Sequence, residues 1–253
     1  MSPIELSILV GASTLGGGII GLLLQKSLPE HHTSDRSRDM LGAIVGLTSL
    51  LLALVLGTLV GSAYSFYANQ KSEMEMLAAR SLQLDLSLAQ YGDEALPLRV
   101  ALRNTIAGID GLIWGAGHAD AKQFTAAAVL PTLRGMVARL ATLTPTTDGQ
   151  KQLLPTIGSD EAQIQQTRLL MSLQLASPIS WPLLMVVASW SVFLFCGFGL
   201  LSKLNVTTFA ALTFGSFAIA SAIFLILELN EPYSGLFRIP SGPIEQTMEA
   251  LRG

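Results

Sequence analysis

One apolar stretch, residues 40–67, constrains the fold of this chain more than any other feature. It reads MLGAIVGLTSLLLALVLGTLVGSAYSFY and contains no Asp, Glu, Lys, Arg or His. A helix of about 20 apolar residues is long enough to cross the roughly 30 Å hydrocarbon core of a bilayer. Residues 40–67 are therefore predicted to form a membrane-spanning helix, and the rest of the chain must be placed relative to that bilayer.

The composition of the whole chain agrees with this prediction. Of the 253 residues, 50% are hydrophobic and only 13% are charged, whereas about 25% of the residues in a soluble domain are charged. The net charge of −3 gives no reason to expect nucleic acid, which favours strongly basic surfaces. The single cysteine, Cys196, excludes an intrachain disulfide and a cysteine-rich metal site. The lipid bilayer is the first expected partner.

Three further apolar runs, residues 4–24, 178–201 and 206–227, are also long enough to span a bilayer. The stretch before the first run has no Lys or Arg, which favours a retained helix over a signal peptide. A turn at residues 202–205 makes the last two runs an antiparallel hairpin. The predicted fold class is an all-α polytopic membrane protein with four transmembrane helices and with both termini on one side.

The chain divides by composition into four parts. Residues 1–67 hold the first two spans and a polar hairpin at 25–39, and residues 178–230 hold the other two spans. Residues 231–253 form a C-terminal tail, in which several prolines forbid a continued helix. Within the tail, Ile244, Met248 and Leu251 would share one face of a short amphipathic helix, suited to the membrane surface or to a partner helix.

The fourth part, residues 68–177, is a polar insertion with nearly balanced acidic and basic residues. Its composition predicts helices near 69–90, 94–117, 119–142 and 159–177, with a turn at 91–93 and a proline-containing loop at 144–158. Asp160 and Gln163 resemble a capping box for the last of these helices. Because the insertion has few aromatic residues, we expect a helical extension that packs on the membrane helices or on neighbouring subunits, not a domain with a large core of its own.

Pairs of glycines four residues apart recur in the first two spans. Such spacing lets helices approach closely in lipid, although glycine is also simply common in membrane helices. The candidate helix-packing residues are Gly17, Gly21, Gly42, Gly46, Gly57 and Gly61.

Small hydroxyl side chains mark one face of the second span. Thr58, Ser62 and Ser65 follow at i, i+4 and i+7 and therefore share a face. This face could line a water-filled path or could form hydrogen bonds with a neighbouring helix. Glu228 ends the fourth span, where it marks the bilayer boundary or faces a polar path. These four residues are the candidate pore-lining residues.

No enzyme signature occurs in the sequence. His31 and His32 are adjacent in a polar loop, and adjacent histidines do not match the i, i+4 spacing of a helical metal site. His118 lies far from both. A phosphate-binding loop of the Gly-x4-Gly-Lys type and a Gly-x-Ser-x-Gly motif are both missing. We therefore expect no enzyme, no cofactor and no metal site.

Three stretches, in the same order along the chain as in the family, resemble the bestrophin-like family of bacterial membrane proteins. The shared domain of this family is described as one of unknown function. The first is GLTSLLLALVLGTLVGSAYSFYANQKSEMEMLAARSLQLDL, and the second is Arg168 followed by PISWPLL. The third, LNEPYSGLFRIPSGPIEQTMEAL, is similar to the end of the family and keeps its Pro232, Ser234 and Gly235. Asn230 and Glu231 stand where the family tends to have Asp-Arg, so no role is carried over to that pair.

The resemblance implies a function by analogy with bestrophins, which are oligomeric anion channels with four spans and extended helices. It implies a multi-pass protein of the bacterial inner (cell) membrane that conducts inorganic ions as a homo-oligomer. The alternative is a membrane-anchored scaffold or sensor whose helical insertion binds a partner. The resemblance implies that the insertion lies in the cytosol. The basic residues of the polar hairpin instead favour a cytosolic hairpin, which would put the insertion outside.

Overall fold

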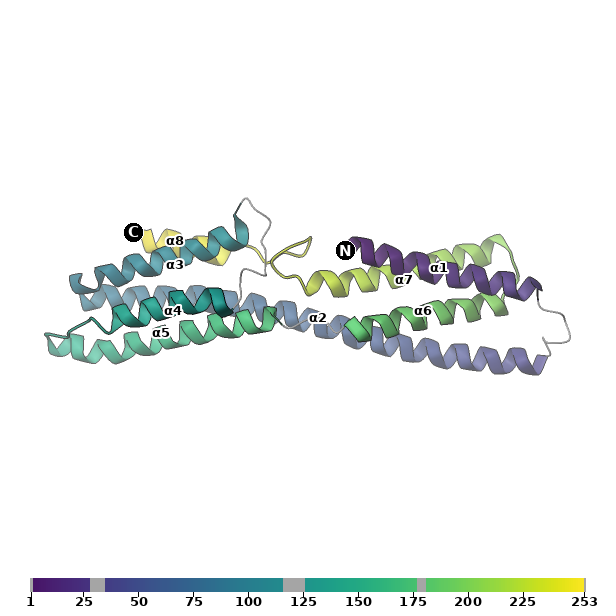
Figure 1. Ribbon diagram of the computed structural model, residues 1–253, viewed down its shortest axis with the longest axis horizontal. Coiled ribbons are helices and arrows are strands. Elements are labelled where there is room, and N and C mark those ends of the chain that lie inside the picture. Colours follow the sequence, from purple (N-terminus) through teal and green to yellow (C-terminus); the bar gives the residue numbers. More distant parts are fainter. Residues whose placement is uncertain (1, 28–34, 116–125, 177–180, 253) are drawn as a thin grey trace. The chain divides into compact units, whose positions relative to one another are not determined.

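A computed structural model describes residues 2–27, 35–115, 126–176 and 181–252. Helices form all the regular structure in these ranges, with no strand among them (Figure 1), so the predicted all-α class is confirmed. The helices are α1 (Pro3–Ser27), α2 (Asp35–Tyr91), the 3₁₀ helix η2 (Asp93–Ala95), α3 (Leu96–Trp114), α4 (Ala126–Leu140), α5 (Asp148–Leu175), α6 (Trp181–Leu201), α7 (Val206–Leu229) and α8 (Gly242–Arg252).

The chain forms two compact units. The first, which we name the membrane unit, comprises residues 1–66 and 179–230. The second, which we name the polar unit, comprises residues 67–178 and 231–253. Helix α2 supplies residues to both units.

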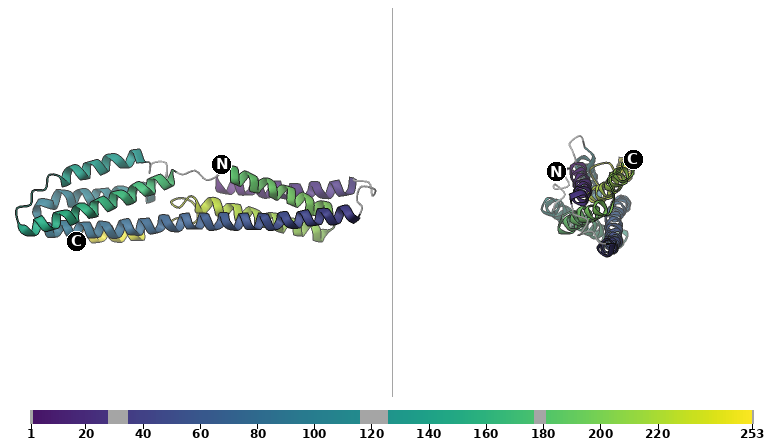
Figure 2. Two further views of the ribbon diagram at one scale, coloured as in Figure 1. Left: turned by 90° about the horizontal axis from the view of Figure 1, so that it is seen from below. Right: turned by 90° about the vertical axis from the view of Figure 1, so that its right-hand side faces the viewer.

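The membrane unit contains four helices that are long and apolar enough to cross a membrane. The most apolar windows of α1, α2, α6 and α7 have mean hydropathies of 1.9, 2.5, 2.2 and 2.2. Within this unit α1 packs along both α6 and α7 (Figures 1 and 2). The four predicted spans are therefore present as helices.

Close backbone contact between α1 and α6 depends on glycine. A Cβ atom on Gly17 would lie 2.6 Å from the carbonyl oxygen of Val192, and one on Gly21 would lie 2.1 Å from that of Cys196. From the opposite helix, a Cβ on Gly199 would lie 2.2 Å from the carbonyl oxygen of Gly18. Backbones this close leave no room for any side chain, which is the packing that small residues permit in lipid.

The polar unit has its own hydrophobic core. Side chains of α2, α3, α5 and α8 form one buried cluster, in which Leu77, Leu102, Met171 and Ile244 are at most 1% exposed. The expectation of an extension without a core of its own was wrong. Aliphatic and methionine side chains make up most of the interior, beside Tyr91 and Tyr233, and the C-terminal tail contributes some of these residues.

Two features connect α2 and α3 within the polar unit. Gly92 has a φ of 115°, in the region that glycine adopts without steric cost, and it allows the turn that sequence analysis predicted at 91–93. Beyond this turn the Arg99 guanidinium donates two hydrogen bonds, of 2.8 and 2.7 Å, to the two carboxylate oxygens of Asp85. This fork-to-carboxylate geometry is one of the stronger polar contacts in proteins.

Helix α8 packs against α3 of the same chain. Ile244 and Leu251 are buried on its apolar face, and Met248 is partly buried beside them. The predicted face is thus confirmed. Its partner is a helix of the polar unit.

Several predicted boundaries differ from the observed ones. The hairpin at 25–39 is shorter, because residues 25–27 belong to α1 and residues 35–39 to α2, while 28–34, with both adjacent histidines, lie outside the described residues. Three further predicted features also lie outside the described residues. They are His118, residues 119–125 at the predicted start of the third insertion helix, and residues 178–180 at the start of the third span.

The loop predicted at 144–158 is wrong for most of its length. Helix α5 begins at Asp148, since Thr147 and Gln150 form a capping box at its N-terminus. Asp160 and Gln163 lie inside α5 and cap nothing. Pro155 lies in the third turn of α5 and does not end the helix.

Candidate functional site

The part of α2 in the membrane unit is the least covered of the four spans. Only 11% of its most apolar window is buried, against 33% for α1, 39% for α6 and 28% for α7. Val45, Leu52 and Ala63 form its one buried stripe. Most of this stretch, the most apolar of the four, is therefore left uncovered by the described part of the chain.

The residues predicted to have a role on α2 fall on two strips of this open surface. Successive residues of a helix are about 100° apart. Counted from Val45, the four glycines lie at about 60–160° and the three hydroxyl residues at about 200–260° around the axis. We name the first the glycine strip (Gly42, Gly46, Gly57 and Gly61) and the second the hydroxyl strip (Thr58, Ser62 and Ser65).

The hydroxyl strip is exposed on the surface of the single chain. Thr58 Oγ1 donates to the carbonyl oxygen of Val55 at 2.9 Å, and Ser65 Oγ donates to that of Gly61 at 2.9 Å. With their protons directed to the helix backbone, these hydroxyl groups present acceptor lone pairs outward. Water, a cation or a donor from another helix could bind there.

Among the described residues, the glycine strip has no packing partner. A Cβ atom on any of its four members would have no atom within 4 Å, outside the helix's own nearby backbone. Gly17 and Gly21 on α1 are the opposite case, because α6 already lies against them. The six predicted packing residues thus include two that contact another helix of the chain and four that are open.

Glu228 lies at the end of α7, buried and only 3% exposed. It does not reach the open surface of the single chain. Asn230 follows as the C-terminal cap, and its side chain donates to the carbonyl oxygen of Ile226 at 2.7 Å.

The C-terminal motif residues lie in a loop that closes on the polar unit. The amide of Ile239 donates to the carbonyl oxygen of Pro232 at 2.8 Å, Ser234 bonds to Glu231, and Gly235 takes a φ of 77°. Trp114 of α3 donates from its indole to the Ile239 carbonyl at 3.0 Å. Pro232, Ser234 and Gly235 are therefore loop-forming residues.

A buried polar relay starts from the same loop, and the sequence did not reveal it. The hydroxyl of Tyr233 donates to Gln70, Gln70 donates to Gln174 at 2.6 Å, and Gln174 donates to Glu73 at 2.9 Å. Burial, and secondarily the charge of Glu73, raises the pKa of the Tyr233 hydroxyl, which therefore stays protonated as a donor. Only the position of Tyr233 inside the motif could have pointed to this relay.

Metal binding has no support in the described residues. No group of three or more His, Cys, Asp or Glu side chains in these ranges could hold a metal ion.

Comparisons with known proteins assign most of the chain to one family. The family model described as the bestrophin-like domain matches residues 12–244. No curated protein matches the sequence.

Solved structures of bacterial proteins share the fold. Three are mutant forms of a bestrophin homologue from Klebsiella pneumoniae. One has a TM-score of 0.66 and 16% identity, covering 99% of this chain and 98% of its own. A second has a TM-score of 0.66 and 16% identity, and the match covers 99% of this chain and 97% of that one. A third has a TM-score of 0.61 and 16% identity, and the match covers 96% of this chain and 97% of that one. At 16% identity, the likeness to these structures shows the fold alone.

Proposed function

This chain belongs to the bestrophin-like family, whose model spans residues 12–244, and from this premise we propose that it is a homo-oligomeric, channel-like membrane protein that conducts ions. We place it, as a multi-pass protein, in the bacterial inner (cell) membrane. The proposal gives the chain no enzymatic role and no cofactor. The ions that the protein would conduct are inorganic ions.

The open surface of α2 is the observation that carries the proposal. Lipid is a good solvent for an apolar helix face, but small residues and hydroxyl groups on one side of a membrane helix suit a contact with another helix. The glycine strip suits close approach of a helix from another copy. The hydroxyl strip beside it then faces the path that the copies enclose.

The same surface is apolar nearer the start of α2. Leu47, Leu50 and Leu54 are 61%, 71% and 65% exposed and, at about 100° per residue, lie on the side opposite the buried stripe. A path lined by α2 would be narrow and apolar at these leucines and polar at Thr58, Ser62 and Ser65. Apolar constrictions control conduction by excluding water.

Glu228 has a secondary place in this proposal. A ring of carboxylates on a path favours cations, but Glu228 is buried within its own chain. We propose that it affects conduction only if assembly or opening brings it to the path.

Ion flux from liposomes that contain the purified full chain tests the proposal, with chloride and potassium gradients applied separately. Thr58→Val keeps the shape of the side chain and removes its hydroxyl. A lost hydrogen bond changes free energy by about 0.5–1.5 kcal/mol, so the flux should change by about two- to tenfold. Ser62→Ala, Ser65→Ala and Glu228→Gln are measured alongside.

Ser189→Ala is the matched control. Ser189 is an exposed serine of α6 whose hydroxyl donates to the Val186 carbonyl at 2.8 Å, and its loss should leave the flux unchanged. Absence of flux under both gradients, over a range of pH and voltage, would overturn the proposal and support the scaffold alternative. Flux insensitive to every hydroxyl-strip variant would move the path away from α2.

A further inference from the structure

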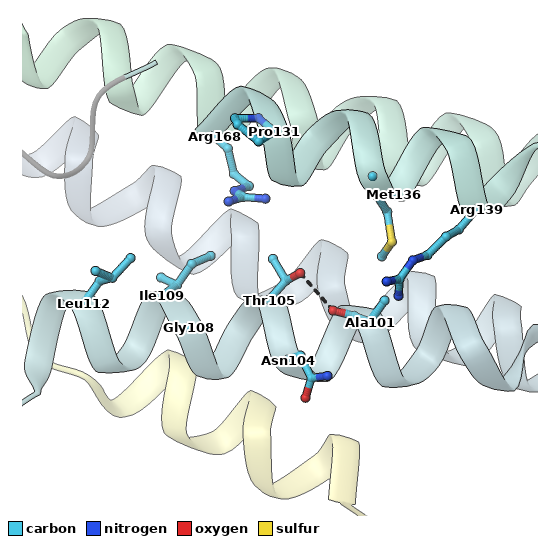
Figure 3. A pocket seen from close by; sticks show the side chains of 11 residues that line it. Ala101, Asn104, Thr105, Gly108, Ile109, Leu112, Pro131, Met136, Arg139 and Arg168 are labelled. Atoms are coloured by element: carbon cyan, nitrogen blue, oxygen red, sulfur yellow. Dashed lines mark hydrogen bonds between the residues drawn. The ribbon is translucent and has the colours of Figure 1, made fainter. Parts of the chain in front are cut away.

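A cavity of about 470 Å³ lies in the polar unit between α3, α4 and α5 (Figure 3). Its volume is within the range of small-molecule sites. Polar and apolar side chains both line it, among them Asn104, Thr105, Ile109, Met136, Arg139 and Arg168. Neither the hydroxyl strip nor the glycine strip contributes to it.

Arg168 is the unusual member of this lining. The residue is only 7% exposed, and its Nε atom is buried with no hydrogen-bond partner. Arginine stays charged in proteins, and a buried charge without a partner costs several kcal/mol. A bound ion or ligand is one of the ways in which such a buried polar atom obtains its missing partner.

The charge of Glu161 acts on Arg168 but does not supply that hydrogen-bond partner. Glu161 is one of the charges that act on Arg168, but its carboxylate forms no ion pair with Arg168 among the described residues, where the three ion pairs join other side chains. Glu161 is also buried and bonds to Gln165 at 2.9 Å. The guanidinium of Arg168 thus remains available.

Arg139 brings a second positive charge to the cavity. In Figure 3 the side chains of Arg139 from α4 and Arg168 from α5 both extend toward α3. Two guanidinium groups on one cavity attract oxyanions, since the guanidinium fork matches the geometry of carboxylate and phosphate oxygens. Ile109 and Met136 give the same cavity an apolar wall.

We propose that this cavity binds a small organic anion, whose carboxylate or phosphate group is held by Arg168 and attracted by the further positive charge of Arg139, and whose apolar body contacts Ile109 and Met136. An inorganic ion would satisfy the arginines but would leave the apolar wall unused. The site is separate from the proposed ion path, so the two can be tested independently.

Calorimetric titration of the purified full chain in detergent tests the site, with benzoate and phenyl phosphate as anionic probes. Benzylamine has a similar shape and the opposite charge, and inorganic phosphate has no apolar body. We expect saturable binding of at least one anionic probe, at least tenfold weaker binding of inorganic phosphate, and no binding of benzylamine.

Variants assign the binding to the arginines. Arg168→Gln should weaken the anionic probe at least tenfold, and Arg139→Gln, at a more exposed residue, should weaken it without disturbing the fold. Arg134→Gln is the matched control, because Arg134 is an exposed arginine of α4 that does not line this cavity. Equal binding of benzylamine, or of inorganic phosphate, would overturn the proposal, as would binding unchanged in Arg139→Gln.

Discussion

The hydroxyl of Tyr233 donates a hydrogen bond of 3.1 Å to the side-chain oxygen of Gln70, 163 residues earlier in the chain. Tyr233 is 3% exposed and Gln70 is fully buried. The ring of Tyr233 also meets that of Trp114 edge to face, with centroids 6.5 Å apart. The C-terminal motif thereby holds α2, α3 and, through Gln174, α5 together inside the polar unit.

Removing that hydroxyl should destabilise the polar unit. Tyr233→Phe leaves the ring in place but leaves Gln70 without its donor in a buried site, which costs about 1–3 kcal/mol. We expect the free energy of unfolding in detergent, measured with denaturant, to fall by this amount. Tyr64→Phe is the control, because Tyr64 is 62% exposed, and it should cause no change. An unchanged stability in Tyr233→Phe would show that the relay is not a stabilising element.

Glycine at position 21 is required by its contact with α6. The Cβ of Gly21→Ala would lie 2.1 Å from the carbonyl oxygen of Cys196, so the helices must separate. Overpacking of this kind costs about 1–3 kcal/mol, and we expect a clear fall in the thermal unfolding midpoint in detergent. Gly16→Ala, on the same helix with no atom within 4 Å of its Cβ, should leave the midpoint unchanged or raise it slightly. Similar effects of the two variants would contradict this packing.

Sequence reasoning found what is encoded locally. An apolar run of spanning length depends only on consecutive residues, so four spans could be predicted, and Gly92 marked a turn for the same reason. The start of α5 was missed because Pro145 and Pro155 favoured a loop there, whereas the capping box of Thr147 and Gln150 begins the helix at Asp148.

Contacts between distant residues were beyond sequence reasoning. Gln70 and Gln174 are 104 residues apart, and a glutamine in a polar helix gives no sign that it will be buried. Arg168 was noticed only as part of a motif, because its burial depends on how other helices of the polar unit pack against α5. The candidate residues of α2 were recognised from their spacing, but their exposure became visible only in the folded chain.

Stability of the polar unit should depend on pH through Glu161. Burial raises the pKa of its carboxyl group, outweighing the opposing effects of Gln165 and of the Arg168 charge. The folded state therefore holds this proton more tightly than the unfolded state, whose glutamate pKa is about 4.3. The stability it contributes is fully present below that pH and is lost as the pH rises through the raised pKa.

Glu161→Gln removes this dependence. We expect the stability of the variant, relative to the natural chain, to increase as the pH is raised from about 4, in denaturant unfolding at a series of pH values. Glu75→Gln serves as the control for exchanging a glutamate for a glutamine in this unit, since the Glu75 side chain is 53% exposed. A flat difference for Glu161→Gln would mean that Glu161 titrates normally.

The glycine strip of α2 should act in assembly and not in the folding of one chain. A side chain at Gly57 or Gly61 meets no atom within 4 Å, so the double variant Gly57→Leu, Gly61→Leu should keep its helical content. It would nevertheless block the close approach of a helix from another copy, which small residues make possible in lipid. We expect light scattering in detergent to show a smaller particle.

Ala210→Leu separates this effect from the mere addition of bulk to a membrane helix. Ala210 is an exposed residue of α7, and a leucine there should leave the particle mass unchanged. If the double variant keeps the mass of the natural oligomer, the glycine strip is not a contact between copies and lipid covers it. Because a path lined by the hydroxyl strip needs copies of α2 around it, that result would also remove the structural basis proposed for conduction along α2.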